Sequence, residues 1–243
     1  MKKYIFVSII FLISNLVLSQ VSDMFSTQVS DYKIISKSPY TLIESKDSNR
    51  YTYQIGAPQL PVFSKSYVLP AGSKVTNVTF SGGSKMLLGS TIYLYPTQPP
   101  CLVNQPCPDF VPPDTVIYNS STPFPASTVT TANDGLKFGY HIVTLSICPF
   151  QYIPSERKLY LYNQIDFSIQ YSIGQIDYQV RITENRNQLT KENVRSMVQN
   201  PEMISPSARP SINILDNNPS SRSQFWYQDI DGDTYGNALI SQI

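Results

Sequence analysis

Residues 158–173 read KLYLYNQIDFSIQYSI, and this stretch decides the class of fold. Apolar side chains recur at every second position, while polar residues fill most of the positions between them. An alternation with period two predicts a β-strand with one buried and one wet face. The apolar set is Leu159, Leu161, Ile165, Phe167, Ile169, Tyr171 and Ile173, and the other set is Tyr162, Gln164, Asp166, Ser168 and Gln170.

The alternation changes parity after Gly174, where the apolar residues become Ile176, Tyr178, Val180 and Ile182. A change of parity requires an extra residue in the pairing or a turn, so we predict a bulge or a corner at Gly174. Further strands are predicted upstream, each ended by turn-forming residues. Their ranges are Tyr51–Ile55, Val62–Leu69, Val75–Phe80, Thr91–Tyr95 and Lys137–Ile147.

Repeated short strands without helices between them predict an all-β fold, an immunoglobulin-like or jelly-roll-like β-sandwich. Residues 96–125 are rich in proline, which fixes φ and removes ladder donors, so they predict a long irregular connection on the surface. Thr190 is predicted to cap one short helix that ends before Pro201 and carries Val194, Met197 and Val198 on one face.

The N-terminus has the pattern of a secretory signal peptide. Lys2 and Lys3 precede an uncharged, mostly apolar run over residues 4–18. A membrane anchor is the alternative, but a spanning helix needs about 20 apolar residues and this run is shorter. We expect cleavage between Ser19 and Gln20, secretion or cell-surface exposure in a bacterium, and no membrane contact after cleavage.

Composition shifts divide the chain. The net charge of +1 becomes −1 without Lys2 and Lys3 and contains no long run of one sign, so no nucleic-acid partner is expected. After residue 204 the sequence turns polar and proline-spotted, which is typical of a flexible linker. The expected units are a signal peptide (1–19), the sandwich (24–183), a short helical connector (184–204), a linker (205–224) and an acidic C-terminal tail (225–243).

The three cysteines are Cys101, Cys107 and Cys148. Export permits disulfides, so Cys101 and Cys107 are candidates to close their short loop; three free thiols are the alternative. His141 and Cys148 are the closest candidates for a nucleophile pair, but seven residues of one strand separate them by about 23 Å and place them on opposite faces. No orienting motif accompanies His141 with either other cysteine, so we predict no catalytic residue in this chain.

The tail contains Asp229, Asp231 and Asp233 at alternate positions, with Gly232 among them. Carboxylates in a tight loop are suitable ligands for Ca²⁺. The pattern is not an EF-hand, because no closing glutamate follows. It resembles a single calcium-binding repeat of the thrombospondin type 3 kind, with an acidic solvated turn as the alternative.

The order of several short motifs resembles the propeptide domain of gingipain-type cysteine peptidases, peptidase family C25. The resemblance covers roughly Asp31 to Met203. Its motifs are residues 55–62, 69–72, 95–96, 123–125, 148–154 and 200–202.

The resemblance implies a β-sandwich that assists folding of a cysteine peptidase catalytic domain, in cis or in trans. It also implies a latency loop that places a basic residue in the specificity pocket of the peptidase. Lys137 and His141 are the basic residues of the corresponding segment, before the strand that ends at Cys148; ordinary sheet positions are the alternative.

Where the catalytic domain begins in that family, this sequence continues with the linker and the acidic tail. Three interpretations follow: a truncated precursor, a reused propeptide-like module, or the front of a longer precursor. A function of a different class is also open, a structural or adhesive secreted module whose tail begins a calcium-binding stalk.

Overall fold

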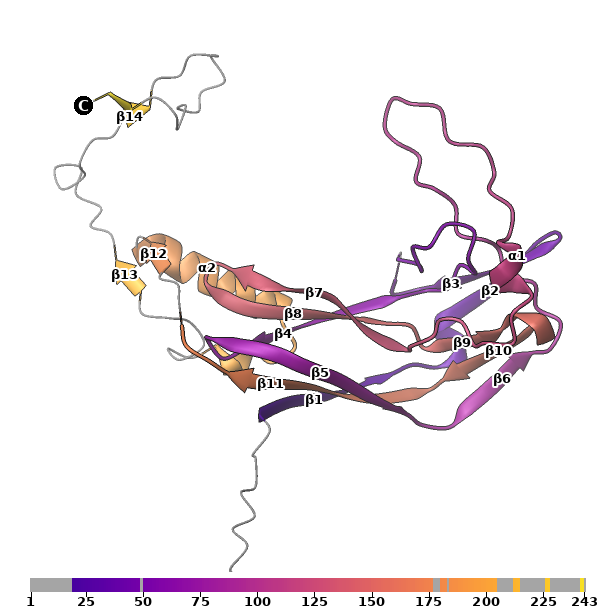
Figure 1. The fold of residues 1–243 in the computed structure, drawn as a ribbon, viewed down its shortest axis with the longest axis horizontal. Coiled ribbons are helices and arrows are strands. Elements are labelled where there is room, and N and C mark those ends of the chain that lie inside the picture. The colour runs from indigo at the N-terminus through magenta and orange to yellow at the C-terminus, as the bar shows by residue number, and fades with distance from the viewer. Residues whose placement is uncertain are drawn as a thin grey trace, which may run out of the picture.

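The computed structural model describes residues 19–48, 50–176, 180–182, 184–204, 212–214, 226–227 and 241–242. Most of them form an elongated β-sandwich (Figure 1). One antiparallel sheet has the order β1-β11-β5, with β1 at Ser19–Ser26, β11 at Gln164–Ile173 and β5 at Ser73–Gly82. The facing sheet has the order β4-β8-β7, with β4 at Phe63–Leu69, β8 at Tyr140–Ile147 and β7 at Val129–Lys137. The predicted all-β sandwich is confirmed.

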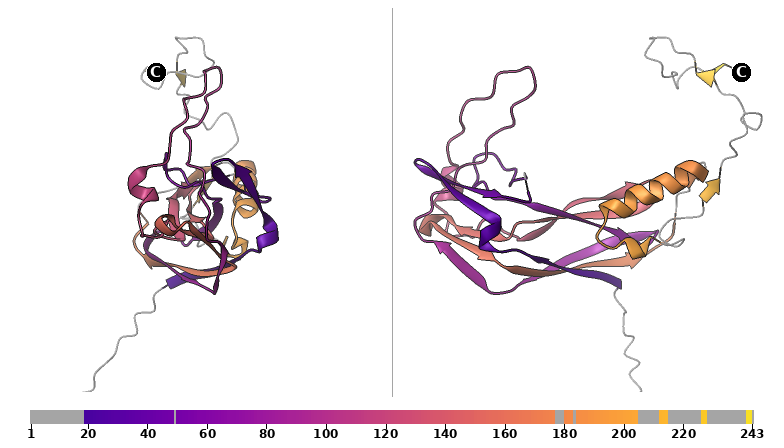
Figure 2. Two further views of the ribbon diagram at one scale, coloured as in Figure 1. Left: turned by 90° about the vertical axis from the view of Figure 1, so that its right-hand side faces the viewer. Right: turned by 180° about the vertical axis from the view of Figure 1, so that it is seen from behind.

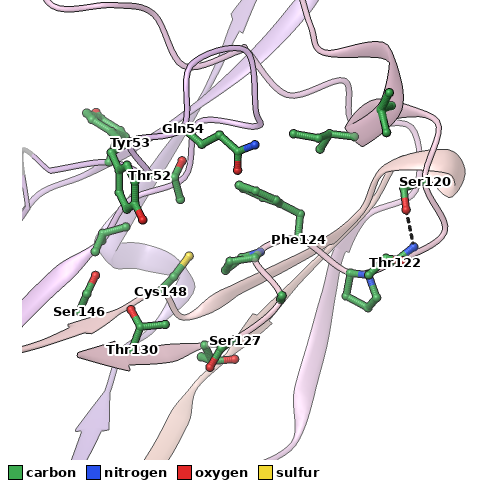
Figure 3. Close-up of a pocket in the computed structure, with 18 residues that line it drawn as sticks. Thr52, Tyr53, Gln54, Ser120, Thr122, Phe124, Ser127, Thr130, Ser146 and Cys148 are labelled. Carbon is green, nitrogen blue, oxygen red and sulfur yellow. Dashed lines mark hydrogen bonds between the residues drawn. The ribbon is translucent and has the colours of Figure 1, made fainter. Parts of the chain in front are cut away.

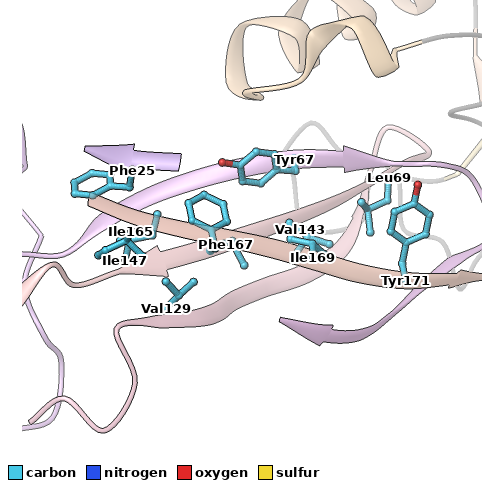
Figure 4. Packing of buried hydrophobic residues seen from close by; sticks show 11 residues of the cluster. Phe25, Tyr67, Leu69, Val129, Val143, Ile147, Ile165, Phe167, Ile169 and Tyr171 are labelled. Atoms are coloured by element: carbon cyan, nitrogen blue, oxygen red, sulfur yellow. The ribbon is translucent and has the colours of Figure 1, made fainter. Parts of the chain in front are cut away.

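The main core lies between these two sheets (Figure 4). In β11 the predicted alternation holds as far as Tyr171, because Ile165 and Ile169 are fully buried while Gln164 and Asp166 are exposed. Ile173, which was predicted on the buried face, is 61% exposed at the end of the strand. Full burial of one such aliphatic side chain stabilises the fold by about 1.5–3 kcal/mol. The cluster contains Phe25, Tyr67, Leu69, Val129, Val143, Leu145, Ile147, Ile165, Phe167, Ile169 and Tyr171.

A second core continues the sandwich lengthwise. Strand β10 (Lys158–Tyr162) leads through Asn163 directly into β11, so one extended path serves both cores. Strands β6 (Lys85–Gly89) and β9 (Phe150–Ile153) flank β10, and the hairpin of β2 (Tyr32–Lys37) and β3 (Tyr40–Ser45) adds side chains. This core contains Tyr32, Ile43, Leu60, Val62, Leu94, Cys148, Phe150, Tyr152, Leu159 and Leu161.

Helix α2 (Glu184–Met197) lies against the outer face of the β4-β8-β7 sheet, as Figures 1 and 2 show. Val194 and Val198 pack there with Val68, Tyr140 and Ile142 of the sheet. The helix ends before Pro201, as predicted. The predicted start was wrong, however: Thr190 is a buried residue inside the helix whose hydroxyl donates to the carbonyl of Asn187 at 3.0 Å.

Several predicted strands need correction. Val62–Leu69 and Val75–Phe80 correspond to β4 and β5, but Lys137–Ile147 is divided by a hairpin turn, so that Lys137 ends β7. Tyr51–Ile55 and Thr91–Tyr95 form only isolated bridges, because the prolines around them cannot donate to a ladder. The first strand begins at Ser19, ahead of the expected domain start at residue 24.

Gly174 lies at a corner. Strand β11 ends at Ile173, and the amide of Gly174 donates to the carbonyl of Gly72 at 2.9 Å. The irregularity in pairing lies upstream, between Gln170 and Tyr171. Gly72 has a φ of +75°, and a Cβ added there would lie 2.8 Å from the Gly174 carbonyl oxygen, so the corner requires glycine at position 72.

The remaining elements are short. Helix α1 (Thr115–Tyr118) interrupts the irregular segment 96–125 and is capped by Asp114. The 3₁₀ helices are η1 (Val29–Asp31), η2 (Pro154–Glu156) and η3 (Pro201–Met203). Strand β12 (Val180–Ile182) pairs in parallel with β13 (Ile212–Ile214), and β14 (Trp226–Tyr227) pairs with β15 (Ser241–Gln242). Within the described ranges no helix has the length and apolarity needed to cross a membrane.

Candidate functional site

The β7–β8 hairpin carries both basic residues predicted for the latency loop. Phe138 and Gly139 form its turn with φ values of 53° and 82°. Positive φ at both central residues of a two-residue connection is the requirement of a type I′ turn, whose twist matches that of the flanking strands. The hairpin therefore has a defined tip, and its last register pair is Lys137 with Tyr140.

The structure places the two basic residues differently. Lys137 is exposed at the tip, with Nζ 3.2 Å from the sulfur of Met197 in α2. His141 is only 7% exposed, and its Nε2 pairs with Oδ1 of Asp134 across the hairpin. Of the two candidates, Lys137 is the one whose charge lies at the surface.

Cys148 is a buried thiol of the second core. Its Sγ donates to the carbonyl of Phe150 at 3.7 Å. Burial raises the pKa of the thiol to about 12, so it is protonated at neutral pH. His141 shares the parity of Val143 and Leu145, which face the main core, whereas Cys148 lies in the second core. As predicted, His141 and Cys148 do not form a nucleophile pair.

Cys148 also lines a pocket that the sequence did not predict (Figure 3). Its volume is about 500 Å³, within the range of small-molecule sites. The walls come from the segment before β4, from α1, from residues 122–128 and from the outer face of the β4-β8-β7 sheet. The lining side chains carry no charge; they include Tyr51, Tyr53, Gln54, Phe124, Thr128 and Ser146. No local pattern marks such a pocket, because its walls are distant in sequence.

A polar cluster joins the first strand to the facing sheet. The hydroxyl of Tyr67 donates to Oδ2 of Asp23 at 2.6 Å, and Nζ of Lys65 lies 2.9 Å from the same oxygen. Partial burial alone would raise the pKa of Asp23, but hydrogen bonds from Tyr67, Lys65 and the Met24 amide outweigh it and lower the pKa. Asp23 is therefore a carboxylate at neutral pH.

The connector after α2 covers the free edge of β4. The side chain of Asn200 accepts from the Val68 amide at 2.9 Å and donates to the Val68 carbonyl at 2.8 Å. The amide of Gln199 donates to the Ser66 carbonyl at 2.8 Å. The Asn200 side chain and the Gln199 amide thus take the place of a neighbouring strand at Ser66 and Val68, whose donors and acceptors an open edge would expose.

Cys101 and Cys107 form a disulfide in the long irregular segment. Figures 1 and 2 show that this segment rises well away from the sandwich, near α1 and far from α2.

Ser19 and Gln20, the predicted cleavage residues, begin β1 and pair with Tyr171 and Gln170.

Asp229, Asp231 and Asp233 lie outside the described residues, so the calcium prediction stays a prediction. In the part of the chain that is described, no three metal-ligating side chains gather into one group.

Comparison with known proteins agrees with this architecture. The family model Propeptide_C25 matches residues 45–204, which include the connector. A solved structure entitled "Complex of Porphyromonas gingivalis RgpB pro- and mature domains" is similar, with a TM-score of 0.58 and 16% identity over 76% of this chain and 92% of that chain.

A second similar solved structure is entitled "Structural insight into zymogenic latency of gingipain K from Porphyromonas gingivalis". Its TM-score is 0.50, with 18% identity over 66% of this chain and 90% of that chain. At these identities the likeness establishes a shared fold. No relative was found among curated protein sequences.

Proposed function

The chain belongs to the family of C25 peptidase propeptides, and we propose that it assists the folding of a C25 peptidase catalytic domain and keeps that domain latent. The observation that carries this proposal is the family match over residues 45–204, which spans most of the sandwich together with its connector. The domain acts without chemistry of its own and works by binding, either in cis within a longer precursor or in trans.

The state of the side chains supports a binding role. The thiol of Cys148 is protonated and buried, and Nε2 of His141 pairs with Oδ1 of Asp134. A nucleophilic cysteine requires a thiolate or an adjacent base within hydrogen-bond reach. We therefore assign the peptidase chemistry to the partner domain.

We further propose that Lys137 provides the basic contact for latency. It stands at the tip of a two-residue hairpin that fixes its position, and its ammonium is exposed. A lysine contact would suit a specificity pocket that contains a carboxylate, since a buried charge needs an opposite charge. Export through the secretory pathway, with a mature chain that starts at Gln20, would bring the domain and its partner to the same compartment.

The function is tested with C25 catalytic domains of Arg and Lys specificity. Each domain is denatured and refolded with and without the purified chain, and the recovered activity is measured after the chain is digested. We expect a higher yield in its presence. An unchanged yield, together with unchanged peptidase activity when the chain is added at micromolar concentration, would contradict the proposal.

The hairpin contact is tested separately with Lys137→Ala. We expect weaker inhibition with an unchanged melting temperature, because Lys137 is exposed. Lys74→Ala on β5 is the matched control, an exposed lysine of a different sheet. Equal inhibition by both variants would remove Lys137 from the contact and leave the propeptide role in place.

A further inference from the structure

The uncharged pocket of Figure 3 is preformed, because hydrogen bonds behind its walls hold them in place. In one wall, the Thr52 amide donates to the Leu60 carbonyl at 2.9 Å, and the Thr52 hydroxyl donates to the Pro58 carbonyl at 2.7 Å. In another, Phe124 and Tyr152 exchange two backbone hydrogen bonds of 2.7 and 2.8 Å. Neither wall depends on an occupant, so a ligand does not have to order the pocket in order to bind.

The floor of the pocket, formed by Thr130 and Ser146, offers hydrogen bonds. Thr130 of β7 and Ser146 of β8 are register partners, and Figure 3 shows them beside Cys148. No hydrogen bond among the described residues engages either hydroxyl. A hydroxyl both donates and accepts, so this pair can bind a hydroxyl or a carbonyl oxygen of a ligand.

The mouth of the pocket, at Tyr53 and Val116, carries apolar surface that the fold leaves in water. Of the large apolar side chains in the described residues, the three most exposed are Tyr53 at 94%, Val103 at 88% and Val116 at 80%. Two of these three line the same pocket, from segments distant in sequence. Exposed apolar side chains that gather around a preformed hollow are typical of a binding site, whereas isolated ones are common on any surface.

The lining limits the class of ligand. None of the described residues that line the pocket is aspartate, glutamate, lysine, arginine or histidine, so a charged ligand would lose its hydration without gaining a partner. A sugar would also fit poorly, because apolar side chains such as Val62, Ile117 and Phe124 would leave most of its hydroxyls unpaired. A neutral molecule with few oxygens agrees with both the apolar walls and the two hydroxyls of the floor.

We propose that this pocket binds an uncharged, mostly apolar organic molecule that contains a ring system and one or two hydroxyl or carbonyl oxygens. The ring system packs against the aromatic side chains of Tyr53 and Phe124, and an oxygen bonds to the floor hydroxyls. The volume of about 500 Å³ suits a molecule of this kind. The site goes beyond the proposed function, because it is lined by α1 and lies away from Lys137, which contacts α2.

The test uses 2-naphthol as a neutral probe, with 2-naphthoate and 2-naphthylmethylammonium as charged probes that have the same ring system. Binding to the full purified chain is measured by protein NMR titration at pH 7, without any peptidase. We expect 2-naphthol to bind with a Kd of about 1 mM or tighter and to shift the amide signals of Thr130 and Ser146. Each charged probe is expected to bind at least about tenfold more weakly.

Two double variants locate the site. Tyr53→Ala with Val116→Ala removes the apolar mouth and is expected to raise the Kd of 2-naphthol about fivefold or more. The matched control is Val103→Ala with Leu189→Ala, two exposed apolar residues outside the pocket, and its Kd is expected to stay within about twofold. All four side chains are exposed, so the melting temperature is expected to stay near that of the parent chain.

The second variant, Thr130→Val with Ser146→Ala, nearly keeps the shape of the floor and removes its hydroxyls. We expect the Kd of 2-naphthol to rise about threefold or more, because the oxygen of the probe loses its partners. An unchanged Kd for both double variants would overturn the inference, and so would equal binding of the neutral and the charged probes.

The remaining outcomes also decide the question. Binding of maltose, a neutral disaccharide, without binding of 2-naphthol would make this a sugar site and contradict the inference. If no probe binds, the inference is wrong. A loss of affinity for a C25 catalytic domain in the mouth variant would then show that the pocket belongs to the peptidase contact, and the propeptide role would stand. Because the probes are titrated without peptidase, failure of the propeptide role leaves this test unaffected.

Discussion

Asn200→Ala tests the role of the connector in the fold. Asn200 makes two hydrogen bonds to the backbone of Val68, a residue with no exposed surface. Removing the amide leaves one buried donor and one buried acceptor without partners, and each such group costs about 1–3 kcal/mol. We expect the free energy of unfolding to fall by about 2–6 kcal/mol, and at about 2–4 °C per kcal/mol for a chain of this length the Tm is expected to fall by at least about 4 °C.

Urea denaturation followed by circular dichroism measures this loss, provided that the m-value is unchanged. Asn200→Asp gives a second reading, because its carboxylate accepts from the Val68 amide but repels the Val68 carbonyl, so it is expected to be no more stable than Asn200→Ala. Asn193→Ala, an exposed position on α2, is the control and is expected to stay within about 0.5 kcal/mol of the parent. A loss below about 0.5 kcal/mol for Asn200→Ala would refute the assignment of this side chain as a substitute strand.

Further predictions concern single sites. The carboxylate of Asp23 has a lowered pKa in the fold. Its contribution to stability is therefore present above its ordinary pKa of about 3.9 and is lost as the pH falls through the folded pKa. Tyr67→Phe is expected to reduce this loss of stability at acid pH, measured by urea denaturation at a series of pH values. Cys148, with its pKa raised to about 12 by burial, is expected to react with a maleimide only after denaturation; rapid labelling of the folded chain at pH 8 would disagree. Gly139→Ala places a side chain at a φ of 82° and is expected to cost about 1–2 kcal/mol in thermal unfolding. For the acidic tail, calorimetry in Ca²⁺ against chelator is expected to show a rise in Tm that Asp231→Ala removes; equal Tm values for the parent would reject the calcium prediction.

Sequence periodicity predicted the strands whose two faces differ most. In β11 apolar and polar residues alternate without interruption, and the burial follows them as far as Tyr171. The break before it was not predicted, although Asn163 occupies a position of apolar parity between Leu161 and Ile165. That polar residue marks the point where the chain passes from one core to the next, although the periodicity alone suggested a single strand.

The first strand escaped prediction because a charged residue stands on its inner face. Val21 and Phe25 point toward the core with Asp23 between them, which hides the alternation. The charge is tolerated because Tyr67 and Lys65 satisfy it from the facing sheet, a contact more than 40 residues away in sequence. No local pattern could reveal that partnership.

Some residues of the candidate site could be predicted from the sequence, and others could not. The Cys101–Cys107 disulfide was predicted from residue type and spacing, whereas Lys137 became a candidate only through the resemblance to C25 propeptides. The role of Asn200 was not predictable, because its partner Val68 lies 132 residues away. The pairing of His141 with Asp134 was not predictable either, because the two residues face each other only when the turn at Phe138 and Gly139 sets the hairpin register.

The central claim is tested most directly by titrating the purified chain against an active C25 peptidase catalytic domain. The account predicts that activity falls to near zero at a molar ratio of one to one, and that a complex of one copy of each partner elutes from a sizing column. Full activity and separate elution with every Arg- and Lys-specific member tried, at micromolar concentrations, would contradict it.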